Sequence, residues 1–292
     1  MKKIILTATM IGIAALSSGA MAADPVAEVE SPFSAVLDGW VGGYFISGES
    51  DNAAPDGTEF FDFGGDFRVR MNIGEMIAIQ GDASAESTDD TSGNDRLEDG
   101  WHVGGHLSLY GDTGLIGIMG AFGEGDLDDN ETGEAWLLGA EGQLYLDHST
   151  LYLQAGYWDA KDVDEEADDA FHNAVFVRGV GRYFVSPQTR LQAELSGAWG
   201  KQDTDDKNME IYGWGVRADH QFTDMLSAFL GYQGAYYDNG SGGDTGDYVD
   251  HQVRAGFSVL FSRPDLMSVD RTGPTLDLPW MGHWAVSGSA ID

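Results

Sequence analysis

Connections of two lengths alternate along this chain, and this alternation most constrains what the chain can fold into. Tight turns lie at 72–74, 111–114, 147–149, 186–188 and 223–224, and runs of alternating apolar and polar residues lead from them into long loops. A soluble sheet protein has no reason to sort its turns into short and long ones in strict order. A transmembrane β-barrel does, because its periplasmic turns are tight and its external loops are long.

The long connections are acidic. They lie around residues 50–59, 87–99, 124–133, 160–170, 201–209 and 239–247. Together with the residues that flank them, they hold most of the 49 acidic residues of a chain whose net charge is −34. Acid-rich segments of this kind cannot bury an apolar core and remain solvated. A surface this anionic also excludes nucleic acid as a partner, because proteins bind nucleic acid largely through its phosphates, which are anionic too.

Two interpretations of the acidic loops are open. Either the acidic residues only keep the loops solvated and apart, or they bind divalent cations that bridge the loops to each other or to anionic lipopolysaccharide. Asp126, Asp128 and Asn130 have the spacing that begins a calcium loop, but Leu137 stands where the closing glutamate should be. The sequence therefore predicts no metal site and no cofactor, and divalent cations stay a candidate partner of the loops.

Twelve strands are expected between these connections, in one all-β domain. Their ranges are 39–49, 60–71, 75–86, 100–110, 114–124, 134–146, 150–159, 171–185, 188–200, 209–221, 225–237 and 248–261. Most are long enough to cross a bilayer at a tilt of about 45°. Because successive side chains point to opposite faces, each strand separates into an apolar and a polar face. In 188–200, Leu191 and Leu195 lie on the apolar face, and Arg190 and Glu194 lie on the other.

Large aromatic residues decide between a barrel and a β-sandwich with one solvated face, since alternation alone fits both. These aromatics share the apolar face of their strands, and most lie within about three residues of an acidic loop. They are Phe61, Trp101, Trp136, Tyr157, Trp199, Trp214 and Tyr236. A sandwich would bury such rings centrally, whereas a barrel places them at the membrane–water boundary on the lipid side. We therefore expect an aromatic girdle near the external end.

Hairpin register gives an independent test of the two faces. A turn centred at 186–187 places Arg178 opposite Glu194 and Arg182 opposite Arg190. Each pair joins two polar-face residues, as a hairpin between two such strands requires. The facing arginines are also the best candidate for a local anion site, because two like charges otherwise repel. The alternative is that each arginine pairs with an acidic residue of the next strand.

The first residues have the features of a secretion signal. Lys2 and Lys3 precede an apolar stretch that ends at Leu16, and a small-residue cleavage site ends at Ala22. No later stretch approaches the roughly 20 apolar residues that a spanning helix needs. The expected parts are a cleaved signal peptide at 1–22, an N-terminal periplasmic segment at 23–38, the transmembrane barrel at 39–261 and a C-terminal periplasmic tail or plug at 262–292.

The last strand resembles that of Gram-negative outer-membrane β-barrels of porin-like type. Residues 256–261 are a glycine followed by alternating apolar residues and a closing aromatic, Phe261, which is similar to the C-terminal assembly signal of that class. In many members this aromatic is the final residue, whereas this chain continues to Asp292. The continuation is a periplasmic tail, a plug or one more hairpin. The resemblance implies the cell outer membrane, with its lipids and lipopolysaccharide as partners.

The inward faces of the expected strands carry charges of both signs. The candidate lumen and selectivity residues are Asp62, Asp66, Arg68, Arg70, Asp82, Glu141, Arg178, Arg182, Arg190, Glu194, Arg217, Asp219 and Arg254, with His102, His106 and Asp250 on the same face. They either pair across strands and fill a narrow barrel, or line a water-filled pore and set its selectivity. Twelve strands lie between the packed interiors of about 8-stranded barrels and the open channels of about 16-stranded ones.

Several functions are compatible with these features. The favoured one is a porin-like channel for passive diffusion of small hydrophilic solutes or ions, weakly cation-preferring because carboxylates ring its external mouth. A non-conducting structural or adhesive barrel is the alternative, and a homo-oligomer is compatible with either. A soluble exported β-protein is a third hypothesis, which extraction without detergent would support.

Enzyme activity is not expected. His106 and Ser108 have the spacing of the pair found in outer-membrane phospholipases, but both fall on the inward face, whereas a lipid-cleaving site should face the bilayer. The sequence has no nucleophile elbow, no Cys/His metal cluster and no phosphate loop.

Overall fold

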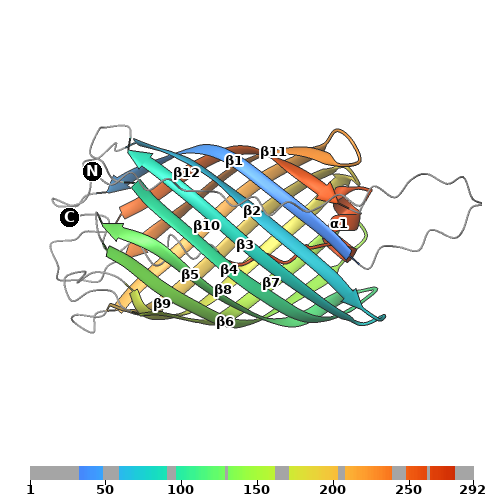
Figure 1. Cartoon of the computed structure of the whole chain (residues 1–292), viewed down its shortest axis with the longest axis horizontal. Helices are drawn as coiled ribbons and strands as arrows, with labels where there is room; N and C mark the ends of the chain where they lie inside the picture. The colour runs from blue at the N-terminus through green and yellow to red at the C-terminus, as the bar shows by residue number, and fades with distance from the viewer. Residues whose placement is uncertain are drawn as a thin grey trace, which may run out of the picture. The chain divides into compact units, whose positions relative to one another are not determined.

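The fold is a closed antiparallel β-barrel of twelve strands. The structure is a computed structural model and describes residues 33–48, 59–90, 97–128, 131–161, 171–202, 208–238, 248–261 and 264–279. Each strand pairs with its neighbours in sequence, and β1 also pairs with β12, which closes the sheet (Figure 1). The expected all-β barrel and its strand number are confirmed.

The strands are longer than the sequence pattern indicated. They are β1 Phe33–Gly48, β2 Glu59–Ile73, β3 Ile77–Asp90, β4 Leu97–Gly111, β5 Gly114–Asp128, β6 Glu131–Tyr145, β7 Ser149–Lys161, β8 Phe171–Ser186, β9 Thr189–Gln202, β10 Asn208–Gln221, β11 Leu226–Asp238 and β12 Tyr248–Phe261. One short helix follows them, α1 Leu266–Thr272. Among the described residues, no helix is long and apolar enough to cross a membrane.

The first strand corrects the expected N-terminal boundary. Residues 33–38 were assigned to a periplasmic segment, but β1 begins at Phe33 and pairs with β2 and β12 from there on. The reason is that side chains already alternate between the outer and the inner face of the sheet in residues 33–38. Phe33 and Leu37 are exposed on the outer wall, whereas Val36 and Asp38 are buried.

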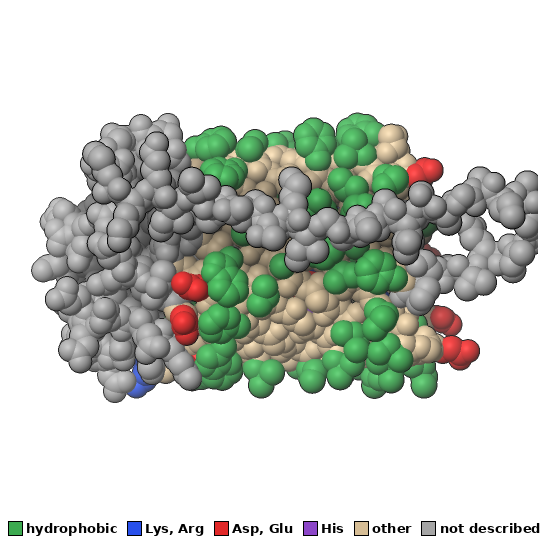
Figure 2. All heavy atoms as spheres, viewed as in Figure 1, with side chains coloured by type: hydrophobic (Ala, Val, Ile, Leu, Met, Phe, Trp, Pro, Cys, Tyr) green, Lys and Arg blue, Asp and Glu red, His purple; other side chains and the backbone are tan. Residues whose placement is uncertain are grey.

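The outer wall of the barrel is apolar. Large exposed side chains cover it, among them Leu195, which is 71% exposed, Ile116, Leu153 and Phe257. Figure 2 shows such side chains spread along the wall, with acidic groups confined to its ends. Because the sheet closes on itself, its backbone groups pair around the ring and no strand edge faces lipid. This wall is that of a barrel that spans a membrane, and its architecture places the protein in the outer membrane.

Tight turns join the strands at one end of the barrel. Residues 74–76 connect β2 to β3, and Gly74 has a φ of 67°, which glycine adopts without strain. The middle residues of the long acidic connections lie outside the described residues, whereas several strands, such as β3 to Asp90 and β5 to Asp128, extend into these connections. The side chains of Asp126, Asp128 and Asn130 are also outside the described part, so the calcium-loop pattern is not tested.

We expect Leu195→Arg to destabilise the barrel by about 2–4 kcal/mol, because Leu195 lies mid-strand on the outer wall, where a charge would enter hydrocarbon. Urea unfolding in lipid vesicles measures this free energy. Leu195→Ala is the control for lost apolar area and should cost less than the arginine. Equal stability of the wild type and the arginine variant would contradict a lipid-facing position.

Candidate functional site: the barrel lumen

The candidate lumen residues all contact another inward side chain, the C-terminal segment or the lumen cavity. Their charges are arranged in ion pairs between strands. Towards the external end, Arg254 of β12 contacts Glu86 at 2.6 Å and Asp62 at 3.3 Å. Its guanidinium also lies 4.8 Å from the ring centre of Trp40. These pairs bridge β12, β2 and β3 across the lumen side of the wall.

A second group of ion pairs is centred on Asp38 and Asp219. Arg68 contacts Asp38 at 2.6 Å, and both Arg217 and Arg190 contact Asp219, at 2.9 and 3.1 Å. The sequence analysis missed Asp38 because it began the first strand at residue 39. The alternation of residues 33–38 was the signal that could have found it.

His106 joins two acidic residues inside the barrel. One ring nitrogen lies 2.6 Å from Asp82 and the other 2.8 Å from Glu141. The hydroxyl of Tyr152 donates to the same Glu141 at 2.7 Å. Because carboxylates take both ring nitrogens, neither is directed at Ser108, which is buried on the inner wall. His106 and Ser108 therefore lack the geometry of a lipid-cleaving site.

The expected register of the β8–β9 hairpin is wrong by two residues. Arg178 lies opposite Ser196, and Arg182 lies opposite Gln192. The turn is at 187–188, later than expected, and an error of one residue in its centre shifts the pairing by two and leaves the faces unchanged. Arg178 still reaches Glu194 diagonally, at 2.7 Å.

The proposed anion site between Arg182 and Arg190 is also corrected. Arg190 lies opposite Phe184 and contacts Asp219 at 3.1 Å. Arg182 contacts Asp270 at 2.8 Å, a residue that the sequence placed beyond the barrel. Each arginine is therefore neutralised by its own carboxylate, and the two do not form a common site.

The C-terminal segment enters the periplasmic end of the lumen. Asp265 caps α1 by accepting a hydrogen bond from the Ser268 amide at 2.7 Å, and Gly273 ends the helix. In Figure 1, α1 lies at the end of the barrel where the tight turns join the strands. Residues 273–279 continue from it as an extended strap. We call α1 the anchor and residues 273–279 the stopper.

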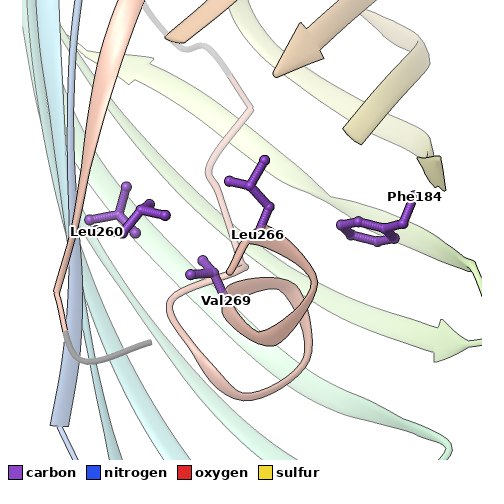
Figure 3. Close-up of a cluster of buried hydrophobic side chains, with 5 residues drawn as sticks. Phe184, Leu260, Leu266 and Val269 are labelled. Atoms are coloured by element: carbon purple, nitrogen blue, oxygen red, sulfur yellow. The ribbon is translucent and has the colours of Figure 1, made fainter. Parts of the chain in front are cut away.

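The anchor is held by apolar packing. Leu266 and Val269 of α1 form a buried cluster with Val36 of β1, Phe184 of β8 and Leu260 of β12 (Figure 3). Such clusters remove apolar surface from water and are worth about 25 cal/mol per Å² buried. Thr150 donates to Asp270 at 2.5 Å and adds a buried polar contact to the same helix.

The stopper crosses the lumen among polar and apolar wall residues. Leu276 is buried among Leu115, Tyr145, Tyr152 and Val180. Its carbonyl accepts a hydrogen bond from the Gln80 side chain at 2.6 Å, and its amide donates back to Gln80 at 3.3 Å. The stopper is thus bonded to β3 and packed against β5 to β8.

Leu278 occupies space left by a glycine of the wall. A Cβ atom on Gly104 of β4 would collide with Cδ1 of Leu278. The absence of a side chain at position 104 therefore gives the stopper room to lie against the wall.

Asp277 is the charged contact of the stopper. Its carboxylate lies 2.8 Å from Arg178 and 3.4 Å from Arg182, and its backbone carbonyl accepts from Gln154 at 2.8 Å. Burial acts to raise the pKa of Asp277, but the guanidiniums of Arg178 and Arg182 outweigh it, so the pKa lies well below its usual range. Asp277 is therefore ionised in the docked stopper.

A cavity of about 200 Å³ lies in the lumen beside the stopper. Arg178, Asp277 and Leu278 line it together with Asp66 and Arg217. Charged groups thus surround a space large enough for several water molecules. Among the described residues, no group of three or more His, Cys, Asp or Glu could hold a metal ion.

The candidate girdle aromatics lie on the outer wall. Phe61, Trp101, Tyr157 and Trp199 are exposed there, whereas Trp136, Trp214 and Tyr236 are partly covered. Several form ring pairs with aromatics of the same or a neighbouring strand, which are Phe61 with Phe63, Trp101 with Phe122, Trp136 with Tyr157 and Trp199 with Tyr212. Trp214 donates to Tyr232, whose hydroxyl bonds His251. Their role at a membrane boundary stays a prediction.

Comparisons with known proteins agree with this fold. The COG4313 outer membrane channel from Pseudomonas putida F1 is similar over 82% of this chain and 100% of its own, with a TM-score of 0.59 and 14% identity. The protein has the fold of a porin-like outer-membrane barrel. No family model and no curated protein matches the chain.

Two porins of known structure are more distant. The KdgM porin covers 77% of this chain and 98% of its own at a TM-score of 0.47 and 8% identity. The NanC porin covers 76% and 98% at a TM-score of 0.46 and 13% identity. Both TM-scores lie below 0.5, so the fold rests on the first similarity and on the barrel itself.

We expect the stopper to stay docked between pH 7 and pH 5. A carboxylate whose pKa is lowered on docking contributes stability that is complete above the undocked pKa, about 3.9, and is lost as the pH falls towards the docked value. Hydrogen-exchange protection factors for the amides of residues 275–278, corrected for intrinsic rates, measure this. Loss of protection already at pH 5 would contradict the lowered pKa of Asp277.

Proposed function

We propose that this protein is an outer-membrane channel for the passive diffusion of small hydrophilic solutes, with a weak preference for cations. The observation that carries the proposal is the contrast between the two walls. The outer wall is apolar, whereas the inner wall holds charged groups around a cavity. A barrel that served only as a membrane anchor would not need so many charges in its lumen, and water-filled pores use such charges for selectivity.

The cation preference is attributed to the mouth. The charges around the cavity balance, since four acidic residues are matched by four arginines, which are Asp66, Asp82, Glu194 and Asp277 against Arg68, Arg178, Arg217 and Arg254. The long connections and the residues that flank them, in contrast, hold most of the 49 acidic residues. Their field concentrates cations, and at physiological salt it is screened over about 8 Å. We therefore expect a preference that is weak and sensitive to salt.

The tail acts as a closure of the periplasmic outlet in this state. Its contacts extend around the wall, from Val36 of β1 and Gln80 of β3 to Arg178 of β8 and Leu260 of β12. Passage of a solute larger than water then requires the stopper to move. The same closure is the observation that favours the alternative, a structural barrel that does not conduct.

Conductance with unequal KCl on the two sides of a planar bilayer tests the proposed function. We expect measurable single-channel conductance and a reversal potential whose sign indicates cations, declining as total salt rises. A reversal potential of the opposite sign would refute the preference. Complete absence of conductance, for the wild type and for Asp277→Asn alike, would favour the structural barrel.

A disulfide between the stopper and the wall tests the closure. The chain has no cysteine, so the double variant Gly104→Cys with Leu278→Cys introduces a single pair. The two substituted side chains lie at a direct contact of wall and stopper, since a Cβ at position 104 would overlap Cδ1 of Leu278. We expect oxidation to abolish conductance and reduction to restore it.

The single variant Leu278→Cys, treated with the same oxidant, is the control for this lock, because it has the shortened stopper side chain but no partner thiol, whereas Gly104→Cys alone would collide with Leu278. Unchanged conductance in the oxidised double variant would show that solutes pass without movement of the stopper.

A further inference from the structure

Arg182 differs from the other paired arginines of the lumen in the origin of its partners. Its guanidinium contacts Asp270 at 2.8 Å and Asp277 at 3.4 Å, and both residues belong to the tail. Among the described residues of the barrel wall, Gln192 is its side-chain hydrogen-bond partner, at 3.2 Å, and no wall carboxylate pairs with it. A buried guanidinium without a carboxylate is costly, so this position of the wall requires an anion from elsewhere.

The wall also holds the neighbouring Arg178 in position without the tail. Arg178 makes two hydrogen bonds of 2.7 Å to Glu194 and one of 2.8 Å to Gln154. The ring of Tyr152 lies beneath both guanidiniums, 6.0 Å from Arg178 and 5.4 Å from Arg182. Cation–π contacts of this kind fix the direction of a guanidinium. The arginine pair is therefore preorganised whether or not the stopper is docked.

We propose that Arg178 and Arg182 form a carboxylate-binding subsite of the channel, and that Asp277 occupies it as a built-in competitor. A solute that carries a carboxylate takes the place of Asp277 and releases the stopper, while the anchor stays bound. This inference rests on the proposed function, since it requires that solutes enter the lumen.

The geometry gives such a solute a route to the subsite. The cavity of about 200 Å³ is lined by Arg178 and by Asp277 itself, and also by Leu278. A carboxylate in this cavity lies beside both the Arg178 guanidinium and the present partner of that group, Asp277. It does not need to displace α1, whose apolar cluster lies with Leu260 and Phe184. Guanidinium and carboxylate match in shape, which favours a carboxylate over a spherical anion such as chloride.

The tether of the stopper sets the concentration at which competition occurs. Because the anchor holds the stopper near its site, the effective concentration of Asp277 is of millimolar order or higher. A competing solute must therefore reach millimolar concentrations, as nutrients in free diffusion do. The acidic mouth does not prevent this, since its repulsion of anions is screened over about 8 Å at physiological salt.

Cysteine labelling of the full-length protein tests the competition directly. Leu276→Cys places a thiol in the stopper at a position that is 1% exposed, so a small thiol reagent reaches it only after undocking. We expect succinate, at constant ionic strength, to raise the labelling rate at least about fivefold and to saturate in the millimolar range. The equally long 1,4-butanediol and putrescine, neutral and cationic, should have no effect.

Three variants in the Leu276→Cys protein separate the subsite from general loosening. Asp277→Asn removes the competitor and should raise labelling about 10-fold or more without succinate. Asp112→Asn, the same change in a tight turn, should leave labelling unaltered. Arg178→Gln should also raise basal labelling, but it should weaken the response to succinate at least fivefold, because it removes part of the subsite.

A thiol in the anchor shows whether the two parts of the tail move separately. Val269→Cys is buried in the apolar cluster and should stay protected when succinate exposes position 276. Exposure of both positions would refute an anchored stopper.

The proposal is overturned if succinate leaves labelling at 276 unchanged while Asp277→Asn increases it, because the stopper then moves without recognising carboxylates. It is also overturned if both leave it unchanged, because the tail is then a fixed plug. Wild-type conductance in KCl is recorded separately. A conducting protein without a succinate effect refutes this inference alone, whereas absence of conductance in both the wild type and Asp277→Asn refutes the channel.

Discussion

The structure depends on one constraint, which is that every backbone amide and carbonyl within the membrane must be paired inside the protein. Twelve antiparallel strands meet it by closing the sheet between β1 and β12. Closure then fixes the direction of every side chain, because successive residues point alternately to lipid and to the lumen. The charged residues lie inside and are brought close to one another, which is why most arginines of the wall are neutralised by carboxylates of other strands.

The lumen of a barrel of this width can be filled by the chain itself. Wall residues complete most of the ion pairs, but at the periplasmic end the tail supplies Asp270 and Asp277 to Arg182. Packing and charge divide the tail into two parts. The anchor is held by its apolar cluster and by the Asp270–Arg182 pair, whereas the stopper is held by Leu276 and by the two contacts of Asp277 with Arg178 and Arg182. The contacts of Asp277 are open to competition by other anions, whereas the apolar cluster of the anchor is not, so the two parts respond to different influences.

Sequence patterns predicted the barrel well because its period is simple. Alternation placed Arg254, Glu194 and Asp219 on the inner wall, where the structure finds them. The pairing register was harder to predict. An error of one residue in the centre of a turn shifts the residue opposite each position by two, and the side chains stay on the same face. The tail contacts could not be predicted. Apart from Leu260, their partners lie 82 to 233 residues away in sequence, and extended segments such as 273–279 have no periodicity that identifies what they touch.

The apolar cluster beneath α1 has a consequence for how the ring stays shut. Val36 and Leu260 lie directly opposite each other across the junction of the first and last strands, and Leu266 and Val269 pack on both. The helix therefore packs across the junction that joins the two ends of the sheet, which is the strand pairing that closes the longest loop of chain. Its binding surface exists only when the two ends of the sheet have met. Seam closure and helix binding thus stabilise each other, and the segment that narrows the passage also secures the wall around it.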